Sequence, residues 1–505
     1  MSNLKKLAGQ TAIYGISSIL GRVINFLLLP LYITYLSKED LGSFTAIYAF
    51  IAFFNIIFTY GMETTFFRFC TGKGLDPEKV YNNVQSLILT TSLSLGAILF
   101  LSAEQVSNWM DYPGKAYLFQ WTALILTIDA ILAIPYAKLR VENKSIQFAM
   151  TKLLNILLNV GFNIFFIVFC LHVYKGDYLT GLQPLIASFY HPEWGVDYIL
   201  LSNLFANALI VPVLFFLSGK FSWNLDKNIL GPMWHYALPL LFMGLAGVTN
   251  EVFSRFLFEY ILPENFYPGL TSREAGGVFG ANFKLAIFMN LIIQAFKYAA
   301  EPFFFSQSEN KNSPLLYATV MHWFIIFCST LMVFVAVNLN IIGPLILGNK
   351  GYNAGTEIVP MLLMGYLMLG VYFNLSIWFK ITDRTIYSFY ITFTGAVVTI
   401  LVIVLLVPKL GYIGGALSTL ATYVIMSVMC YTFGQKYYPI PYKTTKGVFY
   451  LLVAFALSYI GFYIELDSGL FTILLRNGLA FCFLTLIAFL EKKELSLIFQ
   501  KIKKS

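Results

Sequence analysis

The chain has 505 residues, of which 58% are hydrophobic and 11% are charged, and its formal net charge is +8. A soluble protein carries about 25% charged residues, so this composition excludes a soluble globular protein. The four histidines and five cysteines show no C-x-x-C motif or regular spacing, and no basic run interleaved with aromatic residues suggests nucleic acid. We therefore expect no metal site, no cofactor and no nucleic-acid partner.

Long apolar segments follow one another from Thr11 to Leu490. About 20 apolar residues in a helix cross a bilayer, so each segment predicts one transmembrane helix. Loops rich in Pro, Gly and charge separate the segments. In chain order the predicted spans cover residues 11–36, 41–66, 80–102, 116–137, 146–173, 197–218, 233–260, 276–303, 314–338, 356–379, 385–407, 411–434, 446–464 and 470–490.

Orientation follows from the 33 Lys and Arg residues. One set of loops and helix ends holds 22 of them, including Lys152, and the alternate set holds 7. Because cytoplasmic loops are enriched in Lys and Arg, both termini are predicted to lie in the cytoplasm. The first span lacks a small-residue cleavage site and is expected to remain in the protein. The longest hydrophilic gap, residues 174–197, is too short for a folded catalytic domain.

A weak internal repeat divides the chain. Residues in the second and eighth spans match at a constant offset of 235, and Arg22 and Arg255 have nearly the same offset. The matched pairs are Gly42 and Gly277, Phe44 and Phe279, Ala46 and Ala281, Tyr48 and Phe283, Phe53 and Phe288, and Asn55 and Asn290. We predict two pseudo-symmetric six-helix lobes, residues 1–218 and 219–438. Residues 439–505 would add two transmembrane helices and a basic cytoplasmic tail.

Four basic residues fall inside predicted spans: Arg22, Arg255, Lys284 and Lys297. A charge at mid-bilayer costs on the order of 3 kcal/mol, and such residues usually face a bundle interior or a wet cavity. The alternative is that they reach toward the interface or pair with a neighbour. Arg255, for example, has Glu251 one helical turn before it, at the spacing of a local ion pair.

Polar stripes accompany these charges. Asn155, Asn159 and Asn163 share one face of the fifth span, preceded by Lys152. Asn290, Gln294, Lys297 and Glu301 form a second stripe in the eighth span. Such residues can line a lumen or bond neighbouring helices to one another. The acidic residues Glu63 and Asp129 either couple transport to an ion or pair with Arg68, Lys138 or Arg140.

These residues define a candidate site without catalytic groups. The predicted substrate-binding residues are Arg22, Asn25, Arg255, Lys284, Asn290, Lys297, Asn155 and Asn159. The predicted ion-coupling residues are Glu63, Asp129, Glu251 and Glu301. Arg and Lys bind phosphate well, so a cationic interior favours an anionic cargo, whereas a drug or cation exporter would present carboxylates.

Several motifs resemble a known family. They are Gly21-Arg22-Val-Ile-Asn25-Phe with Leu29-Pro30-Leu-Tyr32, Tyr236-Ala-Leu-Pro239-Leu, Phe283-Lys284-Leu-Ala286, Gln294-Ala-Phe296, Glu301-Pro302-Phe-Phe-Phe305, and Pro408-Lys-Leu-Gly411-Tyr-Ile-Gly414-Gly415-Ala416. Their order and spacing over nearly the whole chain are similar to the polysaccharide transporter branch of the MOP (multidrug, oligosaccharidyl-lipid, polysaccharide) superfamily. Two positions depart from the family pattern: Ser254 stands where Asp is common, and Glu301 where Trp is common.

The resemblance implies an all-α membrane protein with about 14 helices that flips undecaprenyl-pyrophosphate-linked oligosaccharide. By this resemblance Arg22, Arg255 and Lys284 would contact the pyrophosphate or sugar-phosphate part of the cargo. It also implies alternating access, coupling to a proton or sodium ion, a bacterial inner-membrane location, and membrane lipids and glycan polymerase machinery as partners. The alternatives are a drug or small-molecule antiporter of the same superfamily and a membrane glycan polymerase or ligase. The short loops argue against such an enzyme.

Overall fold

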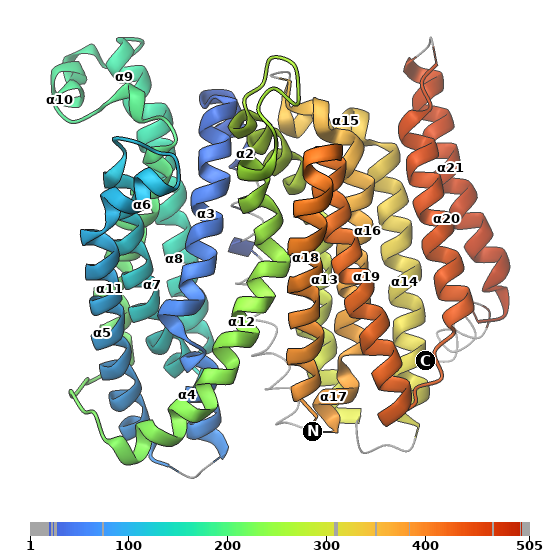
Figure 1. The fold of residues 1–505 in the computed structure, drawn as a ribbon, viewed down its shortest axis with the longest axis horizontal. Coiled ribbons are helices and arrows are strands. Elements are labelled where there is room, and N and C mark those ends of the chain that lie inside the picture. Colours follow the sequence, from blue (N-terminus) through green and yellow to red (C-terminus); the bar gives the residue numbers. More distant parts are fainter. Residues whose placement is uncertain are drawn as a thin grey trace. The chain divides into compact units, whose positions relative to one another are not determined.

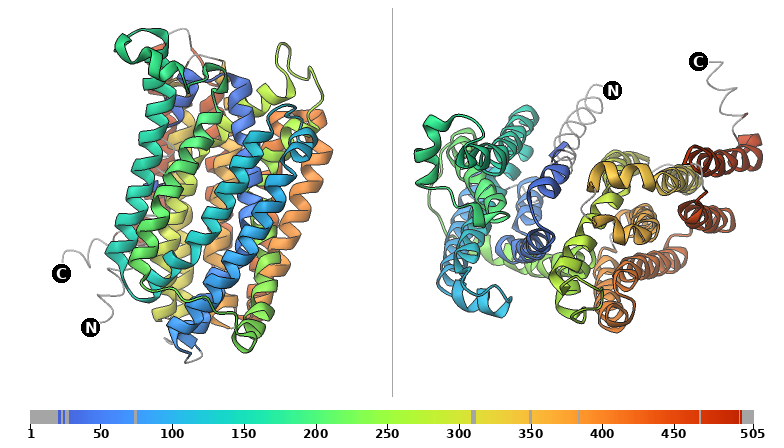
Figure 2. Two further views of the ribbon diagram at one scale, coloured as in Figure 1. Left: turned by 90° about the vertical axis from the view of Figure 1, so that its left-hand side faces the viewer. Right: turned by 90° about the horizontal axis from the view of Figure 1, so that it is seen from above.

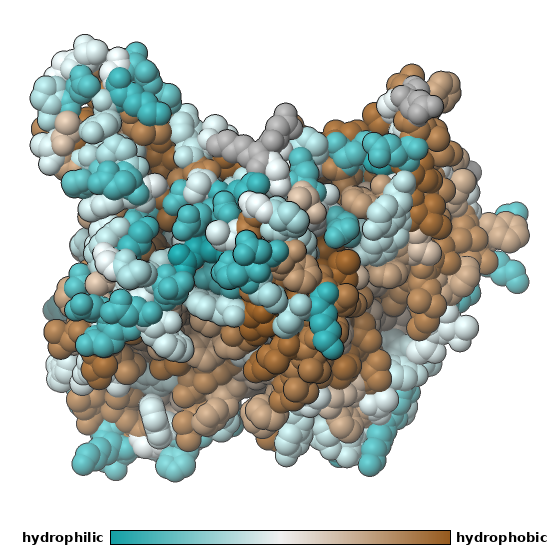
Figure 3. All heavy atoms as spheres, turned by 45° about the horizontal axis from the view of Figure 1, so that its top comes forward, coloured by the Kyte–Doolittle hydropathy of each residue, from teal (hydrophilic) through white to brown (hydrophobic). Residues whose placement is uncertain are grey.

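The computed structural model describes Leu20, Gly21, Ile24, residues 28–72, 75–307, 312–348, 351–382, 384–466, 469–494 and Ser496. In this part of the chain every regular element is a helix. Thirteen helical stretches are long and apolar enough to cross a membrane, and they coincide with the second to fourteenth predicted spans. The first predicted span lies mostly outside the described residues. Hydrophobic side chains cover the helix flanks, and hydrophilic ones gather toward the helix ends (Figure 3). The predicted all-α membrane fold is confirmed.

The described chain divides into two compact units, one ending at Gly277 and the other beginning at Val278. The division falls inside the long helix α13 (Ser272–Gln307). The two predicted lobes, residues 1–218 and 219–438, were defined by the sequence repeat. These lobes and the C-terminal segment 439–505 stay a prediction.

The first unit is a bundle of long helices that run side by side (Figures 1 and 2). Helix α7 packs against both α5 and α11, α8 packs against α11, and α3 packs against α12. Its elements are α2 (Leu29–Tyr35), α3 (Lys38–Thr59), α4 (Met62–Gly72), α5 (Pro77–Leu101), α6 (Ala103–Trp109), α7 (Ala116–Val141), α8 (Ser145–Ile164), the π-helical η1 (Phe165–Cys170), α9 (Leu171–Lys175), η2 (Thr180–Leu182), α10 (Gln183–Ala187), η3 (Pro192–Trp194), α11 (Asp197–Ser218), α12 (Lys227–Ile261) and the start of α13.

Local sequence sets where α3 begins. The Ser37 hydroxyl accepts a hydrogen bond from the Asp40 backbone N–H at 3.0 Å, and the Asp40 carboxylate accepts one from the Ser37 N–H at 3.1 Å. This capping box satisfies backbone donors that the first helical turn leaves without partners. The helix therefore begins immediately after Ser37, and Gly42 follows one turn later.

Two glycines bring the backbones of α3 and α13 into contact within the first unit. A Cβ atom added at Gly42 would lie 2.2 Å from the Arg273 carbonyl oxygen, and one added at Gly277 would lie 2.3 Å from the Lys38 carbonyl oxygen. Real side chains do not tolerate such distances, so this close approach requires glycine on both helices. Gly42 and Gly277 are also a matched pair of the predicted repeat.

The second unit is also all-helical in its described part. Helix α16 packs against α14 and α19, α18 packs against α19, and the C-terminal helices α20 and α21 both contact α14. Its elements after α13 are α14 (Ser313–Val337), α15 (Leu339–Leu347), η4 (Tyr352–Ile358), α16 (Val359–Leu375), α17 (Ile377–Ile381), α18 (Ile386–Leu410), α19 (Tyr412–Tyr437), α20 (Thr444–Tyr463) and α21 (Gly469–Leu490).

Candidate functional site

The first unit contains a polar cavity of about 740 Å³ between α3, α4, α7, α8 and α11. Charged and amide side chains line much of it, although all five helices are apolar along most of their length. We call it the amide cavity. Its lining residues are Ala52, Asn55, Ile56, Thr59, Glu63, Asp129, Leu132, Ala133, Tyr136, Arg140, Phe148, Lys152, Asn155, Asn203 and Asn207.

An amide network orders one wall of the amide cavity. The Asn207 side-chain N–H groups donate to the Asp129 carboxylate at 2.6 Å and to the Asn203 amide oxygen at 3.0 Å. The Asn207 amide oxygen accepts from Asn155 at 2.8 Å, and Asn203 in turn donates to the Tyr48 hydroxyl at 3.3 Å. The network therefore joins α3, α7, α8 and α11.

Replacing Asn207 by Leu should lower the stability of the protein. The change removes the hydrogen-bond partner of Asp129 and of Asn155, which are both half-buried, and a hydrogen bond contributes about 0.5–1.5 kcal/mol. We expect a loss of about 1–3 kcal/mol for the two together, measured as a lower thermal unfolding midpoint in detergent. Asn55→Leu is the matched control, because the Asn55 side chain lines the same cavity without a hydrogen-bond partner among the described residues. Equal effects of the two changes would contradict the network.

Four charged residues lie around the amide cavity. Arg140 donates to Glu63 at 2.6 Å, so these two form an ion pair, and both side chains are more than a third exposed. The Lys152 ammonium lies 3.9 Å from the centre of the Tyr136 ring, a cation–π distance. In the described part of the chain Lys152 has no hydrogen-bonded or ion-paired partner. Asp129 instead accepts from the Asn207 amide.

Among the predicted site residues of the first unit, three meet at the amide cavity: Asn155, Asp129 and Glu63. Of the pairings considered for the two acids, the structure contains the one between Glu63 and Arg140. Asn159 instead bonds to the next residue of its stripe. Its amide and backbone oxygens accept from the Asn163 amide at 3.1 and 2.8 Å.

Two further predicted residues lie on α12. Arg255 donates to the main-chain carbonyl oxygen of Glu251 at 3.3 Å. The Glu251 side chain is exposed and the Arg255 side chain is half-buried. The sequence predicted a local ion pair between Arg255 and Glu251, and the structure shows a hydrogen bond from Arg255 to the Glu251 main-chain oxygen.

The predicted residues of the second unit lie along α13. Asn290 is buried and its amide oxygen accepts from Gln294 at 3.4 Å, as expected from their stripe. Lys297 lies 4.4 Å from the centre of the Phe373 ring. The hollow beside it measures about 20 Å³, enough for little more than one water molecule. Lys284 is half-buried. Arg22, Asn25 and the Glu301 side chain lie outside the described residues.

Sequence reasoning did not select several residues of the cavity wall as site residues, among them Asn55, Lys152, Asn203 and Asn207. Lys152 was counted among cytoplasmic charges, although it precedes Asn155 by three residues and so shares its helix face. Asn203 and Asn207 are four residues apart in the sixth span, and this spacing was the available signal. No feature of the sequence distinguishes Tyr136 from the other tyrosines, of which the chain contains 32 in all.

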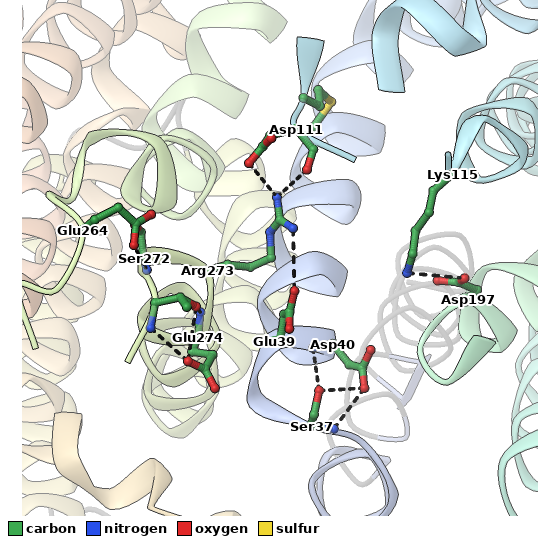
Figure 4. A network of polar contacts seen from close by, with 12 residues as sticks. Ser37, Glu39, Asp40, Asp111, Lys115, Asp197, Glu264, Ser272, Arg273 and Glu274 are labelled. Atoms are coloured by element: carbon green, nitrogen blue, oxygen red, sulfur yellow. Dashed lines mark hydrogen bonds and ion pairs between the residues drawn. The ribbon is translucent and has the colours of Figure 1, made fainter. Parts of the chain in front are cut away.

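A second polar cluster lies at the Ser37 end of α3 (Figure 4). Arg273 donates to the main-chain oxygen of Asp111 at 2.7 Å, and its guanidinium lies 3.5 Å from the Asp111 carboxylate and 3.8 Å from that of Glu39. Near it, Glu264 accepts hydrogen bonds from Ser272. These contacts hold the start of α13 to α3 and to the segment before α7, next to the contact between Gly42 and Gly277.

A buried charged cluster joins the C-terminal helices of the second unit to α14. Glu491, just after α21, is 1% exposed. Its Oε1 accepts from Tyr450 at 2.7 Å and from Lys446 at 2.9 Å, and it lies 3.2 Å from Nε2 of His322. Burial by itself raises the pKa of this carboxyl, but the hydrogen bonds from Tyr450 and Lys446 outweigh it and lower the pKa of Glu491.

The scattered histidines of the sequence predicted no ligand cluster, and this cluster corrects that prediction for His322. His322, Glu491 and Glu494 offer ligand atoms within 4.8 Å of one another. Two ammonium groups compensate the two carboxylates, since Lys446 pairs with Glu491 and Lys443 with Glu494. Sequence reasoning missed the cluster because His322 and Glu491 are far apart in the chain. The charge balance indicates a structural role.

Known proteins resemble this chain in part of its sequence and in its fold. Residues 35–176 match the family model for a polysaccharide biosynthesis protein, and no sequence of a curated protein matches the chain. In structure the chain is similar to the lipid II flippase MurJ in an inward closed conformation. The TM-score is 0.69 at 14% identity, over 95% of this chain and 99% of that one.

The chain is also similar to a multidrug resistance MATE family transporter of the MOP superfamily. For the inward-facing conformation the TM-score is 0.61 at 13% identity, over 84% of this chain and 98% of that one. For the outward-facing conformation it is 0.57 at 14% identity, over 85% and 95%. The fold is therefore that of the all-helical MOP-superfamily transporters. The family match and the fold both agree with the resemblance that the sequence motifs carry.

Proposed function

We propose that this chain flips a lipid-linked oligosaccharide across the bacterial inner membrane, with both termini in the cytoplasm, and that it is not an enzyme. The cargo would be an undecaprenyl-pyrophosphate-linked repeat unit of O-antigen, capsule or exopolysaccharide. The observation that carries the proposal is the amide cavity, a polar space of about 740 Å³ inside a bundle of apolar helices. The match to a polysaccharide biosynthesis family and the likeness to a lipid II flippase support it.

The chemistry of the amide cavity suits sugars. Each sugar hydroxyl that enters hydrocarbon without a partner costs several kcal/mol. Amide and carboxylate groups offer both donors and acceptors, which replace the water that a hydroxyl leaves behind. Alternation between two states, each open to one side of the membrane, would carry the polar part across while the lipid tail stays in the bilayer.

Charge would position the anionic part of the cargo and supply the driving force. Arg255 and Lys284, with Arg22, remain our candidates for contact with the pyrophosphate, because cations in apolar spans bind phosphate strongly. Among the acidic candidates Glu63 is already paired with Arg140. Asp129, which bonds an amide rather than a cation, is therefore the stronger candidate for ion coupling.

The MATE likeness favours one alternative, a drug or small-molecule antiporter. The two functions are separated by supplying both kinds of cargo to the purified protein in vesicles. Flipping is measured as loss of accessibility of a lipid-linked oligosaccharide to a membrane-impermeant oxidant, and drug transport as uptake of a fluorescent organic cation. Oligosaccharide flipping above the level of protein-free vesicles supports our proposal. Cation uptake without flipping would overturn it.

Asn55→Leu should slow flipping while leaving the protein folded. The Asn55 amide lines the cavity and has no partner in the described residues, so it is available to the cargo. One lost hydrogen bond of about 0.5–1.5 kcal/mol corresponds to a rate lower by about 2- to 10-fold. Asn228→Leu, at an exposed position at the start of α12, is the matched control and should flip at the wild-type rate. Equal flipping rates for the wild type, Asn55→Leu and Asn228→Leu would show that the cargo does not pass through the amide cavity.

A further inference from the structure

Lys152 is the unusual member of the amide cavity. Its ammonium contacts the Tyr136 ring and, among the described residues, makes no hydrogen bond and no ion pair. A long cationic side chain in an apolar bundle is costly unless the surrounding field stabilises it. The position of Lys152 therefore depends on the charges that reach it across the cavity.

Three further charged residues line the amide cavity with Lys152: Asp129 and Arg140 on α7 and Glu63 on α4. Arg140 and Glu63 are bonded to each other at 2.6 Å, so their opposite charges largely cancel at a distance. The charge that remains is the Asp129 carboxylate. Asp129 and Lys152 are thus the two opposite charges of the cavity wall that the ion pair of Glu63 with Arg140 leaves over, although they do not form a close ion pair with each other.

The oxygen atoms around Asp129 would suit a small metal cation. A carboxylate and neutral amide oxygens are ligands of the hard type that alkali and alkaline-earth ions prefer. Asp129 and Asn155 both line the space in which the Lys152 ammonium stands. Like charges repel each other more strongly in a protein interior than in water, so a second cation in this space would meet the field of the Lys152 ammonium. The cavity therefore favours one cation at a time.

We propose that Lys152 is a tethered cation that takes the place of an alkali ion beside Asp129 and so determines the ion specificity of the cavity. With Lys152 present the cavity does not bind sodium, and an ion exchanged at Asp129 is a proton. Without Lys152 the same oxygen atoms form a sodium site.

The test is sodium binding to the full-length protein in detergent at pH 8, measured without cargo. Thermal unfolding is compared in NaCl and in choline chloride at equal ionic strength, and ²²Na⁺ binding is measured directly. The wild-type protein should respond equally to both salts. Lys152→Ser should bind Na⁺, with a rise in Tm of about 1–3 °C at ten times Kd. The double variant Lys152→Ser/Asp129→Asn should lose this response, and Lys152→Arg, which keeps the charge, should show none.

Two results would overturn the proposal. One is sodium binding by the wild-type protein that Asp129→Asn abolishes, since the cavity would then accept the ion with Lys152 in place. The other is a folded Lys152→Ser protein with no sodium response. Should Lys152→Ser not fold, Lys152→Gln serves as the second uncharged variant, and the wild-type measurement stands by itself. The inference rests on the proposed function, because ion exchange at Asp129 matters only if the protein transports a cargo. Sodium binding is measured without flipping, so the ion-specificity proposal and the flipping proposal can be contradicted separately.

Discussion

Replacing Glu491 by Leu is expected to release the C-terminal helices from α14. The change removes the acceptor of Tyr450 and Lys446 and leaves the buried His322 beside an apolar group. The Lys446 side chain is 45% exposed and its ammonium can be rehydrated, but the Tyr450 hydroxyl is fully buried and would lose its acceptor. An unsatisfied buried polar group costs about 1–3 kcal/mol, so we expect a loss of that size. The measurement is the thermal unfolding midpoint in detergent, together with hydrogen exchange of α20 and α21. Both helices should exchange faster.

Glu494→Leu is the matched control for this prediction. Glu494 pairs with Lys443 in a half-exposed position, where an ion pair contributes about 0–1 kcal/mol. A loss as large as that of Glu491→Leu would show that burial does not distinguish the two carboxylates.

The Glu491 contribution should also depend on pH. Its pKa is lowered in the folded protein, so its stabilisation is present above the unfolded value of about 4.3 and is lost as the pH falls through the folded pKa. A stability difference between wild type and Glu491→Leu that does not shrink in acid would contradict the cause given for the lowered pKa.

Alanine at Gly42 is the second change with a large expected effect. The new methyl group would lie 2.2 Å from the Arg273 carbonyl oxygen, and a backbone atom cannot move aside as a flexible side chain can. The two helices must separate, which also strains the contacts of Arg273 with Asp111 and Glu39. Overpacking of this kind costs about 1–3 kcal/mol. We expect a lower unfolding midpoint and a lower yield of folded protein for Gly42→Ala, and the same for Gly277→Ala.

Gly161→Ala provides the control. Gly161 lies in α8 with no atom within 4 Å of the position of an added Cβ, so alanine there should stabilise the helix by about 1 kcal/mol. Opposite signs for Gly42→Ala and Gly161→Ala would confirm the close contact. A neutral Gly42→Ala would mean that α3 and α13 do not touch.

The fold could be predicted almost completely from the sequence, because the length and hydropathy of an apolar segment are enough to identify a membrane helix. Among the residues that the structure describes, thirteen helical stretches coincide with predicted spans. The elements that were not anticipated are short or irregular, such as the π-helical η1 within the fifth span and the short helices between α9 and α11. Their identity depends on how the chain packs, and the local pattern of apolar residues does not encode it.

The candidate site was predicted only in part. Asn155, Asp129 and Glu63 could be selected because a polar residue in an apolar span is conspicuous by itself. Which of them meet depends on how helices far apart in sequence pack, as Asn207 shows by bridging α7, α8 and α11. Lys152 was assigned to the membrane surface because a charge count by loop does not consider which helix face a residue occupies. The association of His322 with Glu491 likewise depends on the packing of α14 against α21.

The contact between Gly42 and Gly277 has an evolutionary consequence. These residues hold equivalent positions of the proposed repeat, and they meet each other. In a symmetric pair of subunits, a residue that touches its own counterpart lies on the two-fold axis. Such a contact is what gene duplication and fusion would preserve if the ancestor were a six-helix protein that worked as a homodimer. A single glycine in that ancestor, present once in each subunit, would have allowed the close contact from both sides.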